Sequence, residues 1–439
     1  MARIELMKTA AETALAEAFG AVKDSLPGSS AIRSLREAAF DAFDAKGLPH
    51  RRVEEWRYTD LRALMRDAKP LAAQPDAAAL ARAASVGALM ASAEAIRIVL
   101  VDGVYAPALS YVGALPAGLS ITPLSEALSS GDAVPLGQLS PADNAAVALN
   151  AAFMTDGAVI AVSPNAVIEQ PVHIALIHTG ASAQAVYARS LVTVGEGASL
   201  TLLETYEGPA GVAHQTNAAV ELHLAAGATV HRVKAQTESL ETLHLSTLMA
   251  ELGEGAHLRS FTLSAGSAVA RNQLFLRYAG PSAHATLAGA TLLAGRRHSD
   301  TTLVVDHAAP GGESRELFKA VVDGEARSVF QGKIVVRQAA QKTDGQMMTQ
   351  SLLLSEGGEV NNKPELEIFA DDVVCAHGAT CGQLDEDLLF YLKARGLPHK
   401  DAERLLVQAF LGEAIETVDH EGLREALNAA AAHWLDHRV

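Results

Sequence analysis

The residues best suited to metal chemistry lie in one short stretch, DDVVCAHGATCGQL, which holds both cysteines of the chain. If residues 371–377 form a strand, side chains alternate between its faces, so Cys375 and His377 share one face. Thiolate sulfur and imidazole nitrogen both suit iron and zinc. Cys381 follows residues 378–380, where we expect the strand to turn, so its direction stays open. The stretch therefore predicts Cys375 and His377 as metal ligands.

This set of ligands is incomplete within one chain. A protein metal site normally has three or four ligands, whereas the stretch offers two or, with Cys381, three. No second cysteine–histidine pair follows at zinc-finger spacing. The other histidines are spread along the chain without a ligand-type cluster, so we expect most of them in the core or on the surface. A buried thiol beside a hydrogen-bonded histidine is the structural alternative for Cys375 and His377.

Other reaction chemistries have weaker signals. The chain has no glycine-rich phosphate loop ending in Lys-Ser/Thr and no G-x-S-x-G elbow, which argues against ATP hydrolysis and against a serine hydrolase. Asp371 and Asp372 near His377 are similar to the paired carboxylates of solenoid glycosidases, but neighbouring aspartates on a strand point to opposite faces. We therefore do not expect an enzyme, and a carbohydrate-active β-solenoid enzyme stays as the alternative.

Composition narrows the class of protein. With 439 residues the chain exceeds the usual size of one compact core, so several domains or one elongated repeat domain are expected. The net charge of −16 argues against nucleic acid or an anionic membrane as the partner. Two cysteines cannot form a disulfide framework and fit a reducing compartment. We find no signal-peptide pattern and no apolar run long enough to span a bilayer, so we expect a cytoplasmic protein.

The elements that must position the cysteine–histidine stretch change character along the chain. Residues 1–92 are predicted to form an N-terminal helical region, and residues 93–157 a mixed α/β connecting region with a strand that turns at Asp102-Gly103. Short segments rich in Val, Leu and Thr, separated by glycine-containing turns, predict a β core at residues 158–382. Residues 383–439 are predicted to form a C-terminal helical domain.

A degenerate repeat runs through the predicted β core. Gly-Ala pairs begin at Gly197, Gly227, Gly255 and Gly289, in steps of 30, 28 and 34 residues. Such a period is typical of a β-solenoid, in which each coil buries its apolar side by stacking on its neighbours. A β-sandwich is the alternative that the pattern leaves open.

The helical ends show apolar residues at helical spacing. Near the N-terminus Ile32, Leu35, Ala39 and Phe43 share one face, and Gly47 ends the segment. After a first C-terminal helix that ends at Gly396, two more helices are predicted to form a small cap suited to docking another protein. Their expected apolar faces are Ala402, Leu405, Leu406, Ala409 and Phe410 in one, and Leu423, Ala426, Leu427, Ala430 and Trp434 in the other.

Several motifs resemble the SufB/SufD proteins of the SUF iron–sulfur cluster assembly system. The densest are HAAPGGESRELFKAVVDGEARSVFQGKIVV and TQSLLLSEGGEVNNKPELEIFADDVVCAHGATCGQLDEDLLFYLKARGL, supported by GLPHRRVEEWRYTDL and LNAAFMTDGAVIAV. The chain is similar to the SufD branch. SufB proteins typically read Glu-His-Glu-Ala-Thr where this chain has AHGAT at residues 376–380, and carry an upstream cysteine stretch that SLLLSEGGEVNNKPELEI lacks.

The resemblance implies a mainly β fold, a right-handed parallel β-helix flanked by N-terminal and C-terminal helical regions. It implies a heterodimer with SufB through the β-helices and docking of the ATPase SufC on the C-terminal helices. In the family a histidine at the position of His377 works with a SufB cysteine where the nascent cluster forms. Cys375 matches the family pattern as well, whereas Cys381 lies outside it.

The function implied is a non-catalytic scaffold subunit with an iron–sulfur cluster that is transient, shared with SufB and not tightly bound by the isolated chain. An incomplete site is reasonable if the remaining ligands come from another subunit. Such complexes also associate with reduced flavin, for which no residue of this chain is singled out. The alternative without a sister subunit is a homo-oligomeric iron-binding scaffold, and a homodimer of the isolated chain stays open. No nucleic acid or membrane partner is expected.

Overall fold

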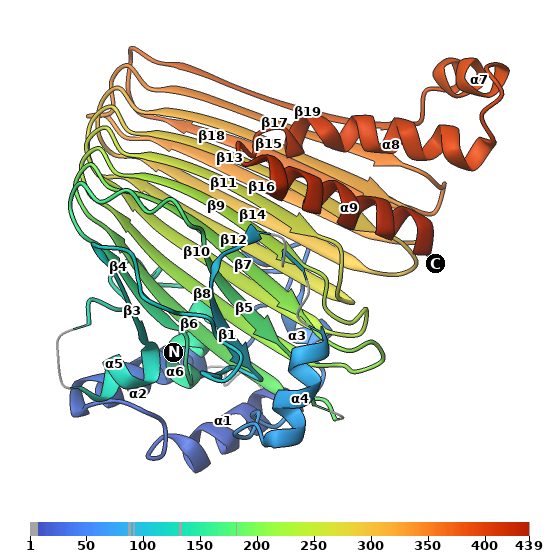
Figure 1. Ribbon diagram of the computed structural model, residues 1–439. Helices are drawn as coiled ribbons and strands as arrows, with labels where there is room; N and C mark the ends of the chain where they lie inside the picture. The colour runs from blue at the N-terminus through green and yellow to red at the C-terminus, as the bar shows by residue number, and fades with distance from the viewer. Residues whose placement is uncertain (1–7, 87–88, 91–92, 131–133, 181, 439) are drawn as a thin grey trace, which may run out of the picture.

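A β-solenoid dominates the computed structural model of the chain, which describes residues 8–86, 89–90, 93–130, 134–180 and 182–438. The fold is mainly β, with about eight solenoid turns flanked by N-terminal and C-terminal helices (Figure 1). This confirms the predicted fold class. The β-sandwich alternative is wrong, because strands that follow one another along the chain alternate between two sheets of parallel strands.

Each solenoid turn contributes one strand to each sheet, so a strand hydrogen-bonds to the second strand before it and the second strand after it. The first sheet contains β1 (Ile96–Val101), β2 (Val104–Tyr105), β5 (Val172–Ile177), β7 (Ser199–Glu207), β9 (Thr229–Gln236), β11 (His257–Ser264), β13 (His284–Leu293), β15 (Glu313–Val322), β17 (Asp344–Leu353) and β19 (Val374–Gln383). The second contains β3 (Leu119–Pro123), β4 (Ala158–Val162), β6 (Ala185–Val194), β8 (Gln215–Leu224), β10 (Leu243–Leu252), β12 (Val269–Tyr278), β14 (His298–His307), β16 (Arg327–Val336) and β18 (Glu359–Ile368).

The solenoid turns one of its corners at residues with positive φ. Gly197, Gly227 and Gly255 have φ of +63°, +64° and +58°, a region that glycine enters without steric cost. Their backbone N–H groups donate to carbonyl groups at the corner of the next coil. These hydrogen bonds connect successive coils. Three of the four predicted repeat positions are thus confirmed as corners.

The fourth repeat position is wrong. Gly289 lies inside β13, where an added Cβ would come within 2.8 Å of the Phe318 ring, so its glycine makes room for a core aromatic side chain. The corner of that coil is formed by Ser282, with φ +55°. The positive-φ conformation at the corner is therefore common to these coils, but the residue that adopts it is glycine in three of them and serine in the fourth.

Helices cover the outer faces of the sheets. The N-terminal helices and α6 pack on the second sheet through a cluster that includes Phe40, Phe153 and Tyr187, whereas α8 and α9 pack on the first sheet through Leu411, Leu427 and Phe261. The helices are α1 (Ala10–Val22), α2 (Ser30–Lys46), η1 (Glu54–Trp56), α3 (Leu61–Leu64), α4 (Ala77–Val86), α5 (Leu124–Ser129), α6 (Ala145–Phe153), α7 (Glu386–Ala394), α8 (His399–Ile415) and α9 (Glu421–His437).

Among the other local predictions, two positions that end an element and one helix face are confirmed, and a second helix face is wrong. Asp102 and Gly103 form the tight turn of the β1–β2 hairpin, both with positive φ, and Gly47 ends α2. The apolar face predicted for α9 packs on the sheet, but that of α8 is rotated. Leu405 is exposed, whereas Val407 is buried, because α8 meets the sheet with the side that carries Val407 and Leu411.

The division of the chain into four parts remains a proposal. β1 belongs to residues 93–157 yet pairs in parallel with β5, so the first solenoid coil draws on the connecting region. Within the described part of the chain, no helix is both long enough and apolar enough to cross a lipid bilayer.

A buried ion pair holds the N-terminal region against the solenoid. Arg271 and Asp300 lie on neighbouring strands, are fully buried and form a salt bridge. The Arg271 guanidinium lies 3.8 Å from the centre of the Trp56 ring, and it donates a 2.7 Å hydrogen bond to the Glu55 carbonyl. One cation therefore anchors η1, far away in the sequence, to β12.

We predict that Asp300→Ala destabilises the protein by about 3–5 kcal/mol, because it leaves the buried Arg271 without its anion. Urea unfolding measures the loss. Asp306→Ala is the matched control, since Asp306 on the same strand pairs with Arg337 at the surface, where we expect a loss below about 1 kcal/mol. Equal losses for the two variants would contradict this role for Arg271.

Candidate functional site

The solenoid ends in an open coil at its C-terminal side. β19 and β18 are the last strands of their sheets, so the part of the chain that the structure describes provides no further strand to pair with their outer edges. Large apolar side chains are exposed there, among them Phe369 (58%) and Val374 (65%). In Figure 1 this end lies opposite the N-terminal helices. Unpaired strand edges together with exposed apolar groups are typical of a surface that pairs with another chain.

Cys375, His377 and Cys381 all lie on β19 and share one face. In the parallel pairing of β19 with β17, Cys375 is opposite Gly345, His377 is opposite Met347, and Cys381 is opposite Ser351. The expectation that the strand turns after His377 is wrong, because β19 continues to Gln383. Because side chains alternate along a strand, Cys381 points to the same side of β19 as Cys375 and His377.

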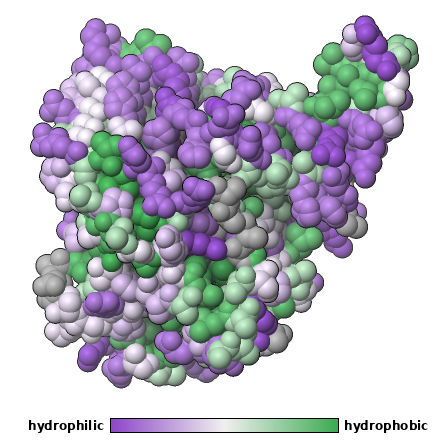
Figure 2. Space-filling view, viewed as in Figure 1, coloured by the Kyte–Doolittle hydropathy of each residue, from purple (hydrophilic) through white to green (hydrophobic). Residues whose placement is uncertain are grey.

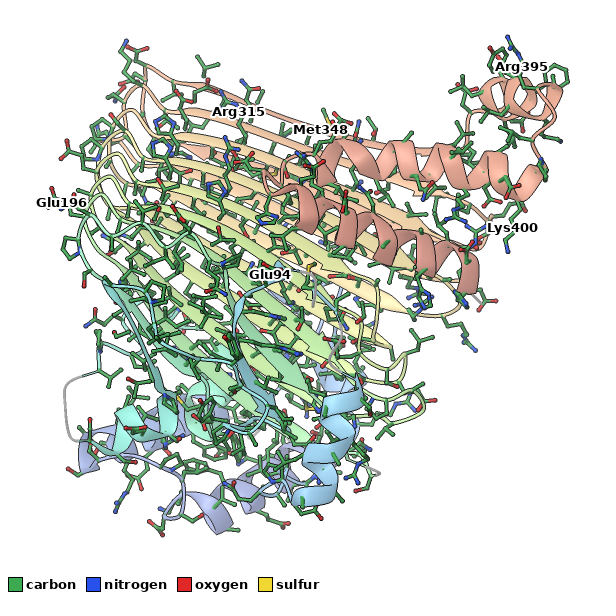
Figure 3. The ribbon with its side chains drawn as sticks, in the orientation of Figure 1. Glu94, Glu196, Arg315, Met348, Arg395 and Lys400 are labelled. Atoms are coloured by element: carbon green, nitrogen blue, oxygen red, sulfur yellow. The ribbon has the colours of Figure 1, made fainter. Side chains whose placement is uncertain are left out.

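This shared face points toward the solenoid interior. The opposite residues of β17 are buried, whereas the residues between them, such as Met348, are exposed. Figure 3 labels Met348 on β17, the strand next to β19, and Arg315 on β15, the strand after it. Cys375 is half-buried against the core, while His377 and Cys381 are exposed because no further coil covers them. The open end therefore presents interior-facing ligand groups to the outside.

Gly345, the residue opposite Cys375 on β17, packs against both an apolar and a polar side chain, Ile334 and Ser314. Gly345 has no side chain, and a Cβ placed there would come within 3.4 Å of the Ser314 hydroxyl oxygen one strand further in. Glu316, two residues along β15, is buried, and burial raises the pKa of its carboxyl to about 8. The open coil thus lies above a polar interior rather than above a wholly apolar one, which sequence alternation alone did not reveal.

The environment disfavours the thiolate of Cys375 in the isolated chain. Burial raises the pKa of the Cys375 thiol, and the carboxylates of Asp344 and Glu316 act in the same direction, while a hydrogen bond from the Gly345 backbone opposes them. Because metals bind the thiolate, a bound metal or a positively charged neighbour has to displace this proton.

The ligand atoms of Cys375 and His377 are of the kinds that bind iron, but there are fewer of them than a protein metal site normally has. Sulfur and imidazole donors lie on one accessible face. Among the described residues, however, no group of three or more His, Cys, Asp or Glu side chains is arranged to hold a metal ion. The assignment of Cys375 and His377 as ligands stays a prediction.

A buried polar network inside the solenoid was not predicted. Lys234 donates hydrogen bonds to His244 (2.9 Å) and Ser246 (2.5 Å), and His244 lies 2.7 Å from Glu238. Burial lowers the pKa of Lys234 to about 7. The signal in the sequence is the run of charged and polar residues at alternate positions of one strand, as Arg232, Lys234 and Gln236 in TVHRVKAQ. This network agrees with the expectation that most histidines serve the core.

The short helix α7 forms a second exposed feature. It projects away from the solenoid (Figure 1), and Arg395 and Lys400 are labelled at this projecting end in Figure 3. None of its residues is buried, and Phe390 (71%), Tyr391 and Leu388 are exposed. Figure 2 shows hydrophobic residues gathered on this projection. A helix that exposes aromatic side chains is suited to binding another protein.

The sequence is similar to one family of known proteins over most of its length. Residues 176–410 match the family model of the SUF system FeS cluster assembly, SufBD core domain, and residues 10–174 match that of the SufBD protein N-terminal region. An iron–sulfur cluster assembly SufBD family protein of Synechocystis is 32% identical over 412 residues, 91% of this chain and 90% of the relative. The iron–sulfur cluster assembly protein SufD of Escherichia coli is 31% identical over 394 residues, 87% and 88% of the two chains.

We predict that Cys375 reacts slowly with iodoacetamide near neutral pH and that its rate rises only at a pH above the ordinary thiol range, because the raised pKa leaves little thiolate. Mass spectrometry of alkylation between pH 7 and 10 measures this in a Cys381→Ser variant, in which Cys375 is the remaining thiol. The same variant unfolded in urea is the control. A folded-state rate profile that matches the unfolded one, or lies at lower pH, would contradict the prediction.

Proposed function

This chain belongs to the SufBD family of iron–sulfur cluster assembly proteins and is homologous to SufD, and from that premise we propose that it is a non-catalytic scaffold subunit. It pairs with SufB, docks the ATPase SufC, and contributes a ligand at the subunit interface where a cluster forms. The cluster is the cargo of this assembly, and it is held transiently.

The observation that carries this proposal is the open coil with its two donors. Cys375 and His377 lie on an interior-facing surface that no further coil covers within the residues that the structure describes. Two ligands do not complete a coordination sphere, and a second chain placed against this coil would supply the others. A site shared between subunits would also release its cluster more readily than a closed set of four ligands from one chain.

The unpaired edges of β18 and β19 support SufB as the molecule that covers this coil. An edge strand with free N–H and C=O groups is a template for pairing, and a related β-helix can supply strands of matching spacing. Phe369 and Val374 would be buried in that contact. When the chain is alone, a second copy can cover the same surface, which is how a homodimer would arise.

The C-terminal helices support the docking of SufC. α7 leaves its apolar side chains exposed, whereas α8 and α9 are fixed to the first sheet. An ATPase that holds α7 would therefore be connected to the solenoid through a rigid pair of helices. A reduced flavin in the assembled complex remains a prediction without an assigned residue.

The two alternatives gain nothing from the comparisons. A carbohydrate-active solenoid enzyme and a homo-oligomeric iron-binding scaffold find no support in the matched families or in the names of the relatives. We therefore advance no second candidate function.

We predict that His377→Ala lowers the cluster yield of the co-expressed complex at least about tenfold, the usual scale for a lost group at a metal site. Anaerobic reconstitution followed by absorbance spectroscopy measures the yield, and gel filtration shows that the complex is intact.

His257→Ala is the matched control, because His257 is an exposed histidine on β11, away from the open coil. It should leave the yield unchanged. An unchanged yield in the His377→Ala complex would remove the proposed role of this side chain.

We predict that Phe390→Asp weakens binding of the SufC ATPase at least about tenfold, because it places a charge where an exposed aromatic side chain would be buried. Surface plasmon resonance with the purified ATPase measures the affinity. Val167→Asp, which introduces the same charge at an exposed position remote in sequence from the C-terminal helices, is the control. Equal affinities for wild-type protein and both variants would place the ATPase elsewhere.

A further inference from the structure

A groove separates α9 from one corner of the solenoid. It has a volume of about 740 Å³ and is formed by α9 on one side and by the residues that follow β7, β9, β11 and β13 on the other. We call it the α9 groove. Its walls are mainly apolar, with contributions from Leu240, Ala265, Ala430 and Trp434. The volume lies within the range of sites that bind small organic molecules.

One cation in the α9 groove lacks an anionic partner. Arg297, in the turn after β13, lines the groove and is only 8% exposed. Its Nε donates to the Ala294 carbonyl at 2.7 Å. Its two terminal nitrogens have no hydrogen-bond or salt-bridge partner among the residues that the structure describes, they are not among the atoms fully closed off from solvent, and burial lowers the pKa of the guanidinium. Burying a charge in this way is costly unless something pairs with it.

The acidic residues of the groove do not neutralise Arg297. Glu238 lies 3.2 Å from His178 and 2.7 Å from His244, so its carboxylate is already engaged in the buried network. It follows β9, two strands from β13, which corresponds to a separation of about 10 Å. Glu207 is the last residue of β7, one strand further away, and its carboxylate accepts a 3.2 Å hydrogen bond from the backbone N–H of Leu89.

Two further donors of the groove are unused. The indole Nε1 of Trp434 and one terminal nitrogen of Arg438 are buried without an acceptor in the described part of the chain. The charge of Arg438 itself is matched by Asp323 and Glu403. These two nitrogens have almost no accessible surface, so the features that the groove offers to a ligand are the unmatched charge of Arg297 and the apolar walls.

We propose that the α9 groove binds a small organic carboxylate with a flat apolar body. A carboxylate carries the single negative charge that one unpaired guanidinium requires, and its two oxygens match the paired terminal nitrogens of Arg297. The apolar body would lie along the alanine face of α9 and the Trp434 ring. This site is separate from the open coil and does not depend on cluster assembly.

The competing explanation is purely structural. The carbonyl groups at the C-terminal end of α9 carry partial negative charge, which could offset a buried cation without any ligand. That explanation predicts that Arg297 stabilises the fold, whereas a ligand site predicts that the empty protein tolerates or gains from its neutralisation.

Isothermal titration calorimetry of the full chain tests the proposal with 2-naphthoate as the probe and 2-naphthalenemethanol as its uncharged counterpart. The variant Arg297→Gln removes the charge. Arg296→Gln is the matched control, because the neighbouring Arg296 is exposed and pairs with Glu325 at the surface. Urea unfolding of the three proteins without ligand is measured in parallel.

We expect saturable binding of naphthoate, at least tenfold tighter than that of the alcohol. Arg297→Gln should weaken it at least about tenfold while Arg296→Gln leaves it unchanged, the scale of one charge-assisted pair of hydrogen bonds. The unfolding midpoint of Arg297→Gln should equal or exceed that of the wild type. Equal affinities for acid and alcohol, equal affinities for all three proteins, non-saturable binding, or a lowered midpoint for Arg297→Gln would each overturn the proposal.

Discussion

A β-solenoid buries its interior only where another coil covers it, and the function that we propose depends on the end at β19, beyond which the described residues provide no further coil. Backbone hydrogen bonds and apolar side chains stacked in register hold each coil against the next. At β19 the stacking ends, so Cys375 and His377, which lie in interior register, are left uncovered on the open side of the last coil. The same ending leaves two strand edges unpaired. One structural fact thus provides both the incomplete ligand set and the surface that a second chain would cover.

The solenoid could be predicted because its repeat is enforced by backbone geometry. Gly197, Gly227 and Gly255 occupy positive-φ corners that most residues avoid, so their spacing is visible in the sequence. The regularity became misleading at Gly289, where a glycine serves side-chain packing, and at Ser282, where a serine adopts the corner conformation. The rotated face of α8 could not be predicted either, because helical periodicity does not say which side meets the sheet.

The candidate site was partly predictable because alternation along a strand is local. It placed Cys375 and His377 on one face, but it gave no reason to extend the strand to Cys381. Parallel pairing with β17 sustains β19 through Gly378 and Ala379, two weak strand formers. Glu316 and Arg297 were invisible for a different reason. Their burial arises from strands and helices distant in sequence, which short-range patterns do not encode. Membership of the SufBD family was predictable because the motifs around residues 307–396 are dense.

The most direct test of shared coordination is the iron retained per polypeptide after anaerobic incubation with ferrous iron and sulfide and gel filtration. We predict that the isolated chain retains none, that the complex with its family partner and ATPase retains a chromophoric cluster, and that Cys375→Ser together with His377→Ala abolishes this retention without dissociating the complex. An isolated monomer that keeps a tightly bound cluster through gel filtration would contradict the claim that this chain supplies only part of a coordination sphere.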